Sequence, residues 1–596
     1  MQKIQDAIKA IIHELYQIDF TPEISPAPKP ELGEYCVNIF GLVKIAWKAP
    51  NIISEEVTKK LAENTEIFRS TSATGGYVNF FLTDSVWMEI FSTLSQPANQ
   101  PTSQKTIIVD YIGMNVGKPP HIGHICTPLL GQSVINTLKY LWYRVIGDSH
   151  LGDWWSLFGK LIVGYKKYGN SESLEEDAIN HLLEVYIKIN ADIEIDNGIE
   201  QECRDAFRHL SHGDKNYTDL WVKFTTATIA TTKSMLQMMH IHQDYDIGES
   251  FYEGLPLPKL WDQPELVYDM NRIVEELIEK WIATQNEDGS VGVVFPEETK
   301  IPSTILRKKD GTNLYLTSDL CAIKYRITNG WNPIKILYFV DVRQQLHLKQ
   351  AFWIARQAWD MESIELSHTY NGAIVLPEWA MSTRKWNIIR LDALVDEGFV
   401  RVKKILEDKE RNLSEKDIRE ITIGAIKYSY LTQDRERDII FTWDKALNFE
   451  WHSGPYIQYA YVRARKISDA SDIRHISDRK YPAWEEQDFS QARNDKNFEL
   501  WTLNFELSQS DKSLIQMLQR FDAAIENTAK TYKPHHLALY AYDLAVGFNS
   551  FYVHTPKILE EKNETLKQIR LSLVTHTADT LKQAFALLAI EMPSEM

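Results

Sequence analysis

The sequence predicts a multidomain α/β protein whose central domain is a doubly wound parallel sheet. At 596 residues the chain is too long for one hydrophobic core, and a prior of about 150 residues per domain indicates several domains. Residues 105–112 (KTIIVDYI) form a β-branched run typical of a buried parallel strand. A helical pattern to about Tyr140 and a second strand-like run, YRVIGDSHLGDWW, follow. Strand, helix and strand in this order indicate a Rossmann-like nucleotide-binding fold.

Residues 1–100 are predicted to form an N-terminal α+β module. The opening stretch MQKIQDAIKAIIHELYQIDF has the pattern of an amphipathic helix. Asp6 and Glu14 interrupt it and no small-residue cleavage site follows, so we expect no signal peptide. Short alternating runs end in GYVNFFL, and the polar stretch at 95–105 reads as a linker.

The central domain is expected to span residues 101–392, with an insertion at about 171–300 that is largely helical and acidic at its start. From Leu314 the alternation of helices and strands returns, with a helix through Tyr325, the strand IKILYFVDV and a helix from about Leu346. From residue 393 to residue 596 helical periodicity dominates, which predicts an all-α C-terminal domain.

Composition limits the class of protein. Hydrophobic content of 44% and charged content of 25% are ordinary for a globular protein, and no apolar run reaches the roughly 18 residues of a membrane helix. Four scattered cysteines without a CxxC pair argue against a disulfide framework or a zinc knuckle, so we expect a cytoplasmic protein with no metal site of its own. The net charge of −17 means that any RNA partner must be held by local basic patches and shape.

The stretch VDYIGMNVGKPPHIGHICTPLLG (109–131) places His121, Gly123 and His124 between a strand and a helix. A helix N-terminus there favours phosphate, because its free N–H groups and its dipole both attract anions. Histidines at i and i+3 share one face and can donate to phosphate oxygens. The alternative is two helix-start histidines without a ligand.

A second polar stretch, LPEWAMSTRKWN (376–387), contains Ser382, Thr383, Arg384 and Lys385. A loop of this composition could close on a triphosphate and neutralise the charge that develops as pyrophosphate leaves. An ordinary surface loop with two basic residues is the alternative.

Together these stretches resemble the class I aminoacyl-tRNA synthetases, and in detail the arginyl-tRNA synthetases. The matching motifs follow one another in the family's order from about residue 70 to the end: 115–124 (NVGKPPHIGH), 150–154 (HLGDW), 310–319 (DGTNLYLTSD), 344–347 (QQLH), 381–385 (MSTRK) and 449–461 (FEWHSGPYIQYAY). The resemblance implies an arginine–tRNA ligase, which forms arginyl-adenylate from L-arginine and ATP with Mg²⁺. Pyrophosphate leaves in that step. The enzyme then transfers the arginyl group to the 2′-OH of the terminal adenosine of tRNA(Arg), and AMP is released.

The resemblance also implies roles for particular residues. The implied catalytic residues are His121, His124, Lys118 and Lys385. The implied ATP contacts are Gly123, Met381 and Ser382, together with His121, His124 and Lys385.

The implied arginine site agrees with the chemistry of the substrate. A guanidinium is planar, permanently charged and carries five donors, so it needs carboxylates in its plane. By resemblance, Asp110, Tyr315 and Asp319 hold the guanidinium, while Asn115 and Gln344 hold the amino-acid head. Tyr315 and Asp319 are spaced i and i+4, on one helix face. The alternatives are a helix-surface Asp, a core Tyr and an N-capping Asn.

Contacts to tRNA are implied at both ends of the chain. The N-terminal module is expected to recognise the tRNA elbow in the D-loop, and the C-terminal domain is expected to bind the anticodon. The implied contacts are Tyr77, Asn79, Tyr456, Tyr459, Tyr552 and Met596, where aromatic rings can stack on unpaired bases. A local basic patch is offered by Arg463, Arg465 and Lys466, although these residues could simply form a solvated helix face. For the tyrosines, the alternative is ordinary packing.

The sequence departs from the family in a few places. Ala380 stands where a lysine is common, Trp386 replaces a glycine, and Trp451-His452 replaces Gly-Asn. Thr383 occupies the second lysine position of the class I loop, for which Lys118 is expected to compensate. These departures concern rate, and they leave two alternatives open: a synthetase for another amino acid, or a catalytically weakened synthetase-derived RNA-binding protein. We expect a monomer.

Overall fold

The computed structural model describes residues 1–94, 105–116, 122–255, 257, 269–375, 390–470 and 506–596. The chain divides into two compact units. The smaller unit contains residues 1–99, 463–522 and 543–580, and the larger unit contains residues 100–462, 523–542 and 581–596. In the described part of the chain, every helix is too short or too polar to cross a membrane.

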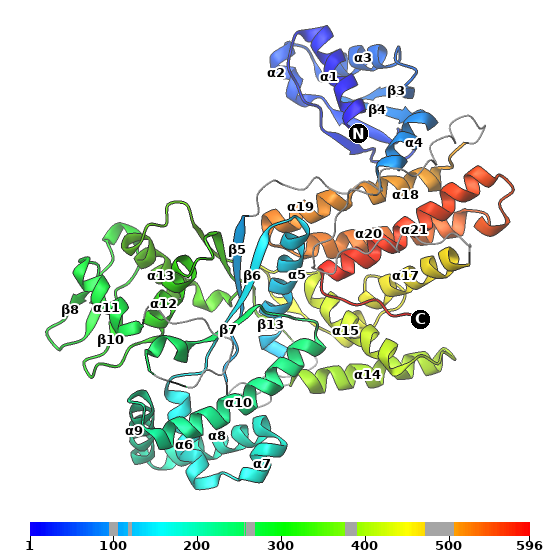
Figure 1. Cartoon of the computed structure of the whole chain (residues 1–596). Coiled ribbons are helices and arrows are strands. Elements are labelled where there is room, and N and C mark those ends of the chain that lie inside the picture. Colours follow the sequence, from blue (N-terminus) through cyan, green and yellow to red (C-terminus); the bar gives the residue numbers. More distant parts are fainter. Residues whose placement is uncertain (95–104, 117–121, 256, 258–268, 376–389, 471–505) are drawn as a thin grey trace. The chain divides into compact units, whose positions relative to one another are not determined.

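The larger unit is built on a five-stranded parallel sheet (Figure 1). Its strands are β5 (Thr106–Ile112), β6 (Arg144–Leu151), β7 (Tyr245–Gly248), β11 (Pro333–Tyr338) and β12 (Glu365–His368), in the order β12-β11-β5-β6-β7. The chain runs from β5 outward to β7 and then returns to the other side of β5. Such a reversal is the point at which doubly wound sheets bind ligands, beside the carboxyl ends of the strands. The predicted doubly wound fold is therefore confirmed.

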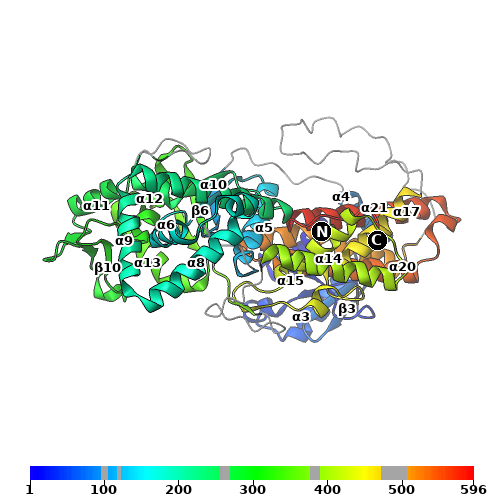
Figure 2. The same cartoon turned by 90° about the horizontal axis from the view of Figure 1, so that it is seen from below.

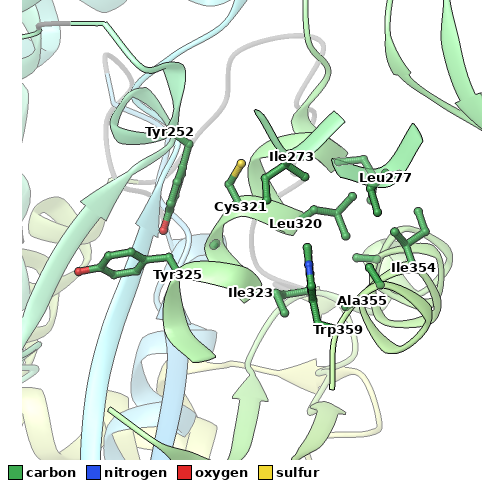
Figure 3. Packing of buried hydrophobic residues seen from close by; sticks show 14 of the residues in the cluster. Tyr252, Ile273, Leu277, Leu320, Cys321, Ile323, Tyr325, Ile354, Ala355 and Trp359 are labelled. Atoms are coloured by element: carbon green, nitrogen blue, oxygen red, sulfur yellow. The ribbon is translucent and has the colours of Figure 1, made fainter. Parts of the chain in front are cut away.

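Successive side chains of β5 point to opposite faces of the sheet. Tyr111 points toward α5 (Cys126–Tyr140), where a Cβ on Gly131 would lie only 2.3 Å from the Cβ of Tyr111. Ile108 points the other way, into a core shared with α11 (Met270–Glu279), α12 (Tyr315–Thr328) and α13 (Gln345–Ala358). Figure 3 shows this core, with Leu320 of α12 beside Leu277 of α11 and Ile354 of α13.

The predicted insertion is mostly helical as far as Met238, and after that it combines short strands with α11. The helices α6 (Ser156–Tyr168), α7 (Ser171–Glu176), α8 (Ala178–Ile195), α9 (Asn197–Ser211) and α10 (Lys215–Met238) pack together (Figures 1 and 2). The chain then adds β7 to the main sheet and forms a separate antiparallel sheet from β8 (Thr284–Gln285), β9 (Val291–Val293) and β10 (Thr304–Arg307). These strands were not predicted because each is only two to four residues long, too short to show a period of two.

The N-terminal module of the smaller unit is α+β, as predicted. Its antiparallel sheet has the order β1-β2-β4-β3, formed by β1 (Ile24–Pro26), β2 (Tyr35–Asn38), β3 (Phe68–Thr74) and β4 (Tyr77–Leu82). The accompanying helices are α1 (Gln2–Tyr16), α2 (Val43–Ala46), α3 (Pro50–Leu61) and α4 (Asp84–Thr93).

A buried carboxylate joins this module to a helix near the other end of the chain. The side chain of Glu34 is fully buried and accepts hydrogen bonds from Leu82 N (2.7 Å) and Trp87 Nε1 (2.9 Å). Lys512 of α18 (Gln509–Gln519), itself buried, places its Nζ 3.2 Å from Glu34 Oε1. Gln516 of the same helix donates to the Glu34 carbonyl at 2.8 Å. Because a lone buried charge is costly, Glu34 and Lys512 depend on each other.

Among the described residues after 390, the secondary-structure elements are helices, apart from β14 (Ile439–Ile440), which pairs with β13 (Ile374–Val375). The helices are α14 (Leu391–Asp408), α15 (Glu415–Leu431), α16 (Trp443–Ala446), α17 (Gly454–Asp469), α18, α19 (Phe521–Thr531), α20 (His535–His554) and α21 (Glu564–Leu587). In the larger unit, α15 holds the C-terminal segment, because buried Lys427 donates to the Ala589 carbonyl and Ser594 N donates to Asp417 (2.7 Å). Burial lowers the pKa of Lys427 to about 7, although Glu420 and Glu591 oppose that shift.

Candidate active site

Polar side chains from five segments of the larger unit gather at the carboxyl edge of the parallel sheet. They lie near or after the ends of β5, β6, β7 and β11 and at the start of α12: Asp110, Asn115, His150, Glu249, Tyr315, Asp319, Gln344 and His347. Parallel strands bring their carboxyl ends to one edge, so residues far apart in the sequence meet there.

Asp319 lies at the centre of this group. Its Oδ2 contacts Nε2 of His347, and its Oδ1 lies 3.4 Å from Nε2 of His150. The Tyr315 ring, one helical turn away, stacks on the His347 ring with centroids 4.8 Å apart. Burial alone would raise the pKa of Asp319, but the hydrogen bond and charge of His347, with His150, hold it below its ordinary value. Asp319 is therefore a carboxylate at neutral pH.

Glu249 is a second carboxylate at this edge, and the sequence analysis missed it. It opens the 3-10 helix η3 (Glu249–Glu253) directly after β7, and Trp155 Nε1 donates to its Oε2 at 2.5 Å. Asp153 fixes the start of η3 by accepting hydrogen bonds from Ser250 N (2.8 Å) and Ser250 Oγ (2.6 Å). Burial, followed by the charges of Asp319 and Asp153, raises the pKa of Glu249 well above its ordinary value. A cation placed near Glu249 and Asp319 would relieve this repulsion.

Asp110 already has a partner within the chain. The guanidinium of Arg326 donates to Asp110 Oδ2 through Nη2 (2.9 Å) and to Asp148 Oδ2 through Nε (2.8 Å), and all three side chains are buried. Burial raises the pKa of Asp148 to about 7, although Arg326 opposes that shift. Asp110 Oδ2 is thus already bonded within the chain, and its expected contact with the guanidinium of a substrate stays a prediction.

Asn115 and Gln344 are exposed at the same edge of the sheet. The backbone around Asn115 is fixed to the end of β6, since Val116 N donates to Gly152 O and Gly152 N donates to Met114 O, both at 3.0 Å. Gln344 ends the 3-10 helix η5 (Val342–Gln344), whose first residue follows the capping Asp341. Their contacts to the head of an amino acid stay predictions.

Comparison with known proteins agrees with this geometry. The family model for the catalytic domain of class I tRNA synthetases of the R type matches residues 89–443. The chain belongs to the class I arginyl-tRNA synthetases. Models of the arginyl-tRNA synthetase N-terminal domain and of the DALR anticodon-binding domain match residues 2–82 and 457–596.

Full-length relatives support the assignment. An arginine–tRNA ligase of Clostridium perfringens is 32% identical over 591 residues, covering 98% of this chain and 97% of the relative. A second, from Fusobacterium nucleatum, is 32% identical over 583 residues, covering 96% and 95%. The solved structure of Thermus thermophilus arginyl-tRNA synthetase has the same fold, with a TM-score of 0.74 at 21% identity over 100% of both chains.

Most of the residues predicted to contact ATP lie outside the described residues. His121 and Lys118 fall there, as do Met381, Ser382 and Lys385 and the unusual Ala380 and Trp386. Gly123 and His124 are described: they belong to the 3-10 helix η2 (Ile122–His124), partly buried just before α5. A helix start therefore follows β5 here, as the sequence predicts.

In the smaller unit, Tyr77 begins β4 and is 41% exposed. Its ring and the Phe40 ring are nearly perpendicular, with their centroids 5.8 Å apart. Asn79, two residues later, is only 1% exposed. Tyr552 is 46% exposed and lies under the guanidinium of Arg463, 5.0 Å from its ring centroid. Tyr77 and Tyr552 are thus partly open to a stacking base, whereas Asn79 is buried.

In the larger unit, Tyr456 and Tyr459 are partly buried on α17, and the Tyr456 ring lies 5.7 Å from that of Tyr542. Met596 is buried, with 6% of its surface exposed. A base could reach only part of the Tyr456 and Tyr459 rings. Contacts between tRNA and these two tyrosines or Met596 stay predictions.

Proposed function

We propose that Glu249 and Asp319 hold the guanidinium of L-arginine and that Tyr315 covers it, in a chain that acts as an arginine–tRNA ligase. The observation that carries this proposal is the carboxylate pair, of which Glu249 lacks an ion-pair partner among the described residues and has its pKa raised. Lysine brings a point charge that cannot bridge two carboxylates. Citrulline is neutral and would leave both carboxylates buried without a cation.

The reaction requires no nucleophile from the protein. The carboxylate of arginine attacks the α-phosphate of ATP, and the bond to the leaving pyrophosphate breaks. A ribose hydroxyl of the terminal adenosine of tRNA(Arg), the 2′-OH in class I enzymes, then takes the arginyl group and AMP leaves. Catalysis therefore consists of positioning and electrostatic stabilisation. Asn115 and Gln344 would orient the amino-acid head.

The phosphates of ATP would meet Gly123 and His124, with His121, Lys118, Met381, Ser382 and Lys385 as the further expected contacts. Mg²⁺ is expected to enter with the nucleotide. The ion's ligands would come mainly from the phosphate oxygens, as is usual for magnesium in such sites.

The tRNA would be bound through its elbow by the N-terminal module and through its anticodon by the C-terminal helices. We expect a cytoplasmic monomer. The relatives give no support to the alternative of a catalytically weakened RNA-binding protein. They are named arginine–tRNA ligase, and they match this chain over nearly their whole length.

Substitution of Glu249 tests the proposal. We expect Glu249→Gln to raise the KM for arginine by about 10- to 100-fold, because a hydrogen bond to a charged group contributes ~1.5–3 kcal/mol. The assay is arginine-dependent ATP–pyrophosphate exchange, with and without tRNA(Arg), alongside lysine and citrulline. Glu253→Gln is the matched control, since this carboxylate ends the same 3-10 helix and burial raises its pKa as well, to about 7. Equal KM values for the two variants would refute the assignment of Glu249.

A further inference from the structure

We propose that Phe40 and Trp47 join Tyr77 in a base-stacking surface on the N-terminal module, which binds unpaired bases of the tRNA elbow without reading their identity. All three side chains belong to the smaller unit and are exposed there. The inference rests on the proposed function, because it assumes that the RNA bound by this chain is tRNA(Arg).

The tip of one hairpin holds two of these rings together. The strands β3 and β4 are joined by Gly75 and Gly76, both at positive φ. A Cβ on Gly76 would lie 2.8 Å from Cζ of Phe40 and 3.1 Å from Cβ of Pro50, so the glycine allows the tip to pack closely on both residues. The Phe40 and Tyr77 rings meet at an interplanar angle of 83°. This packing fixes the two rings relative to each other while both stay partly exposed.

Trp47 lies on the short segment between Phe40 and Pro50, whose two ends therefore both approach the hairpin tip. It caps the end of α2 at a φ of 52°, and 92% of its surface is exposed. An indole with so little contact inside its own chain buries little apolar area and so contributes little to folding. Ile45, on the same segment, is exposed as well. Apolar side chains that gather on a surface in this way mark an interaction site.

The charge around the rings favours an anionic partner. The whole chain has a net charge of −17, yet residues 36–54 contain Lys44 and Lys48 and no acidic residue. The hairpin, residues 68–82, contains Arg69 and again no acidic residue. Lys48 and Arg69 have acidic partners, whereas Lys44 is exposed and forms no ion pair in the part of the chain that the structure describes. Aromatic rings beside a cation are the combination that binds unpaired nucleotides.

The amide side chains beside the rings are poorly placed to read a base edge. Asn79, on the same strand as Tyr77, is buried. Asn38 uses its Oδ1 to accept a hydrogen bond from the Phe40 N–H at 2.9 Å. Stacking on a ring tolerates any base, because every base has a π face. Recognition here should therefore depend on the presence of a base and little on its identity.

An anionic membrane is the other partner that exposed tryptophan and lysine can meet. Binding to anionic lipid headgroups generally requires a cluster of about 4–8 basic residues. Residues 36–54 contain only two lysines, and Glu56 pairs with one of them at 2.7 Å. The sparse charge and the fixed pair of rings therefore favour RNA.

The variant Trp47→Ala tests the surface in the full chain. We expect the Kd for tRNA(Arg), measured by filter binding, to rise about 5- to 100-fold, the usual contribution of one base stacked on one aromatic side chain. In aminoacylation the KM for tRNA should rise, while kcat and the KM for arginine stay the same. Trp47→Phe keeps a ring and should recover most of the affinity.

Trp281→Ala is the matched control. Trp281 is also a tryptophan in the left-handed backbone region, with a φ of 57° and 91% of its surface exposed, but it belongs to the larger unit. Its substitution should leave the Kd for tRNA(Arg) unchanged. Phe40→Leu keeps an apolar side chain against Gly76 but removes the ring, so it should weaken tRNA binding as Trp47→Ala does.

Altered transcripts separate stacking from base reading and from charge. An abasic nucleotide is placed at each unpaired position of the D-loop in turn. Where the missing base is the one that stacks on Trp47, the losses from the abasic nucleotide and from Trp47→Ala should be less than additive. Exchanging that base for the other three should change the Kd little. Lys44→Gln should reduce the slope of log Kd against log salt by about 0.7, and Trp47→Ala should not change it.

Two results would overturn the inference: an unchanged Kd for tRNA(Arg) in Trp47→Ala, or additive losses at every D-loop position. Binding of the unaltered chain to phosphatidylglycerol vesicles, lost in Trp47→Ala while tRNA affinity is kept, would assign the surface to a membrane and overturn it too. These results would leave the proposed function standing, since arginine-dependent ATP–pyrophosphate exchange tests that function separately. Absence of both tRNA binding and exchange in the unaltered chain would overturn the proposed function, and this inference with it.

Discussion

Replacing Arg326 with methionine should destabilise the larger unit, because the buried carboxylates of Asp110 and Asp148 would lose their cation. The guanidinium is 1% exposed and bonds both Asp110 and Asp148, and methionine fills much of its volume without its charge. Removing one partner of a buried ion pair costs about 3–5 kcal/mol. At roughly 2 °C per kcal/mol for a unit of this size, the melting temperature should fall by about 6–10 °C.

The loss should depend on pH in a definite direction. The pKa of Asp148 in the folded chain is about 7, above its ordinary 3.8. An acid whose pKa is raised by folding contributes stability at low pH that is lost as the pH rises toward the folded pKa. Without Arg326 the pKa of Asp148 should rise further, because Arg326 is the group that opposes its upward shift. The deficit should therefore be small at about pH 5.5 and full at about pH 8.5.

Thermal melts of Arg326→Met and the unaltered chain at both pH values test this reasoning, with urea rather than guanidinium chloride for any chemical unfolding, because guanidinium could refill the site. A second variant, Arg326→Met with Asp148→Asn, should recover part of the loss at high pH. An equal loss at both pH values, or no recovery in the double variant, would refute the argument from uncompensated carboxylates.

Two further predictions concern stability elsewhere in the larger unit. Lys427→Met removes a base whose pKa falls from 10.5 to about 7 on folding; such a base makes the folded chain more stable as the pH rises from about 7 to 10. Between pH 7 and about pH 9, the melting temperature of the unaltered chain should therefore rise relative to that of Lys427→Met. A difference between the two melting temperatures that does not change with pH would contradict this. Gly131→Ala places a Cβ 2.3 Å from the Cβ of Tyr111; overpacking should cost about 1–3 kcal/mol in urea unfolding, whereas Gly113→Ala, with open space around its Cβ, should cost little.

The elements that the sequence predicts well are those with a long, uninterrupted pattern. The helix α1 and the strands β5 and β6 were all expected near their observed positions, since each presents several turns or several consecutive buried residues. The strands β7 to β10 carry too few residues for a period to emerge. These strands pair because the rest of the fold brings them together, and a short stretch of sequence does not contain that information.

The candidate site was predictable where its residues share one element and not where they come from several. Tyr315 and Asp319 lie on one helix turn, and the structure places them together. Arg326 reaches Asp110 across 216 residues, so nothing in either motif showed that Asp110 was already paired. Glu249 directly follows the strand Tyr245–Gly248, but that strand is too short for the sequence to show it.

The contact between Glu34 and α18 bears on how the chain is made. Gln516 and Glu34 are separated by 482 residues. At a synthesis rate of about 5–20 residues per second, a ribosome needs roughly 25–100 s to produce α18 after Glu34 has appeared. Throughout that interval the N-terminal module can form its sheet, but its interior carboxylate still awaits Lys512. The first module to leave the ribosome is therefore among the last to be completed.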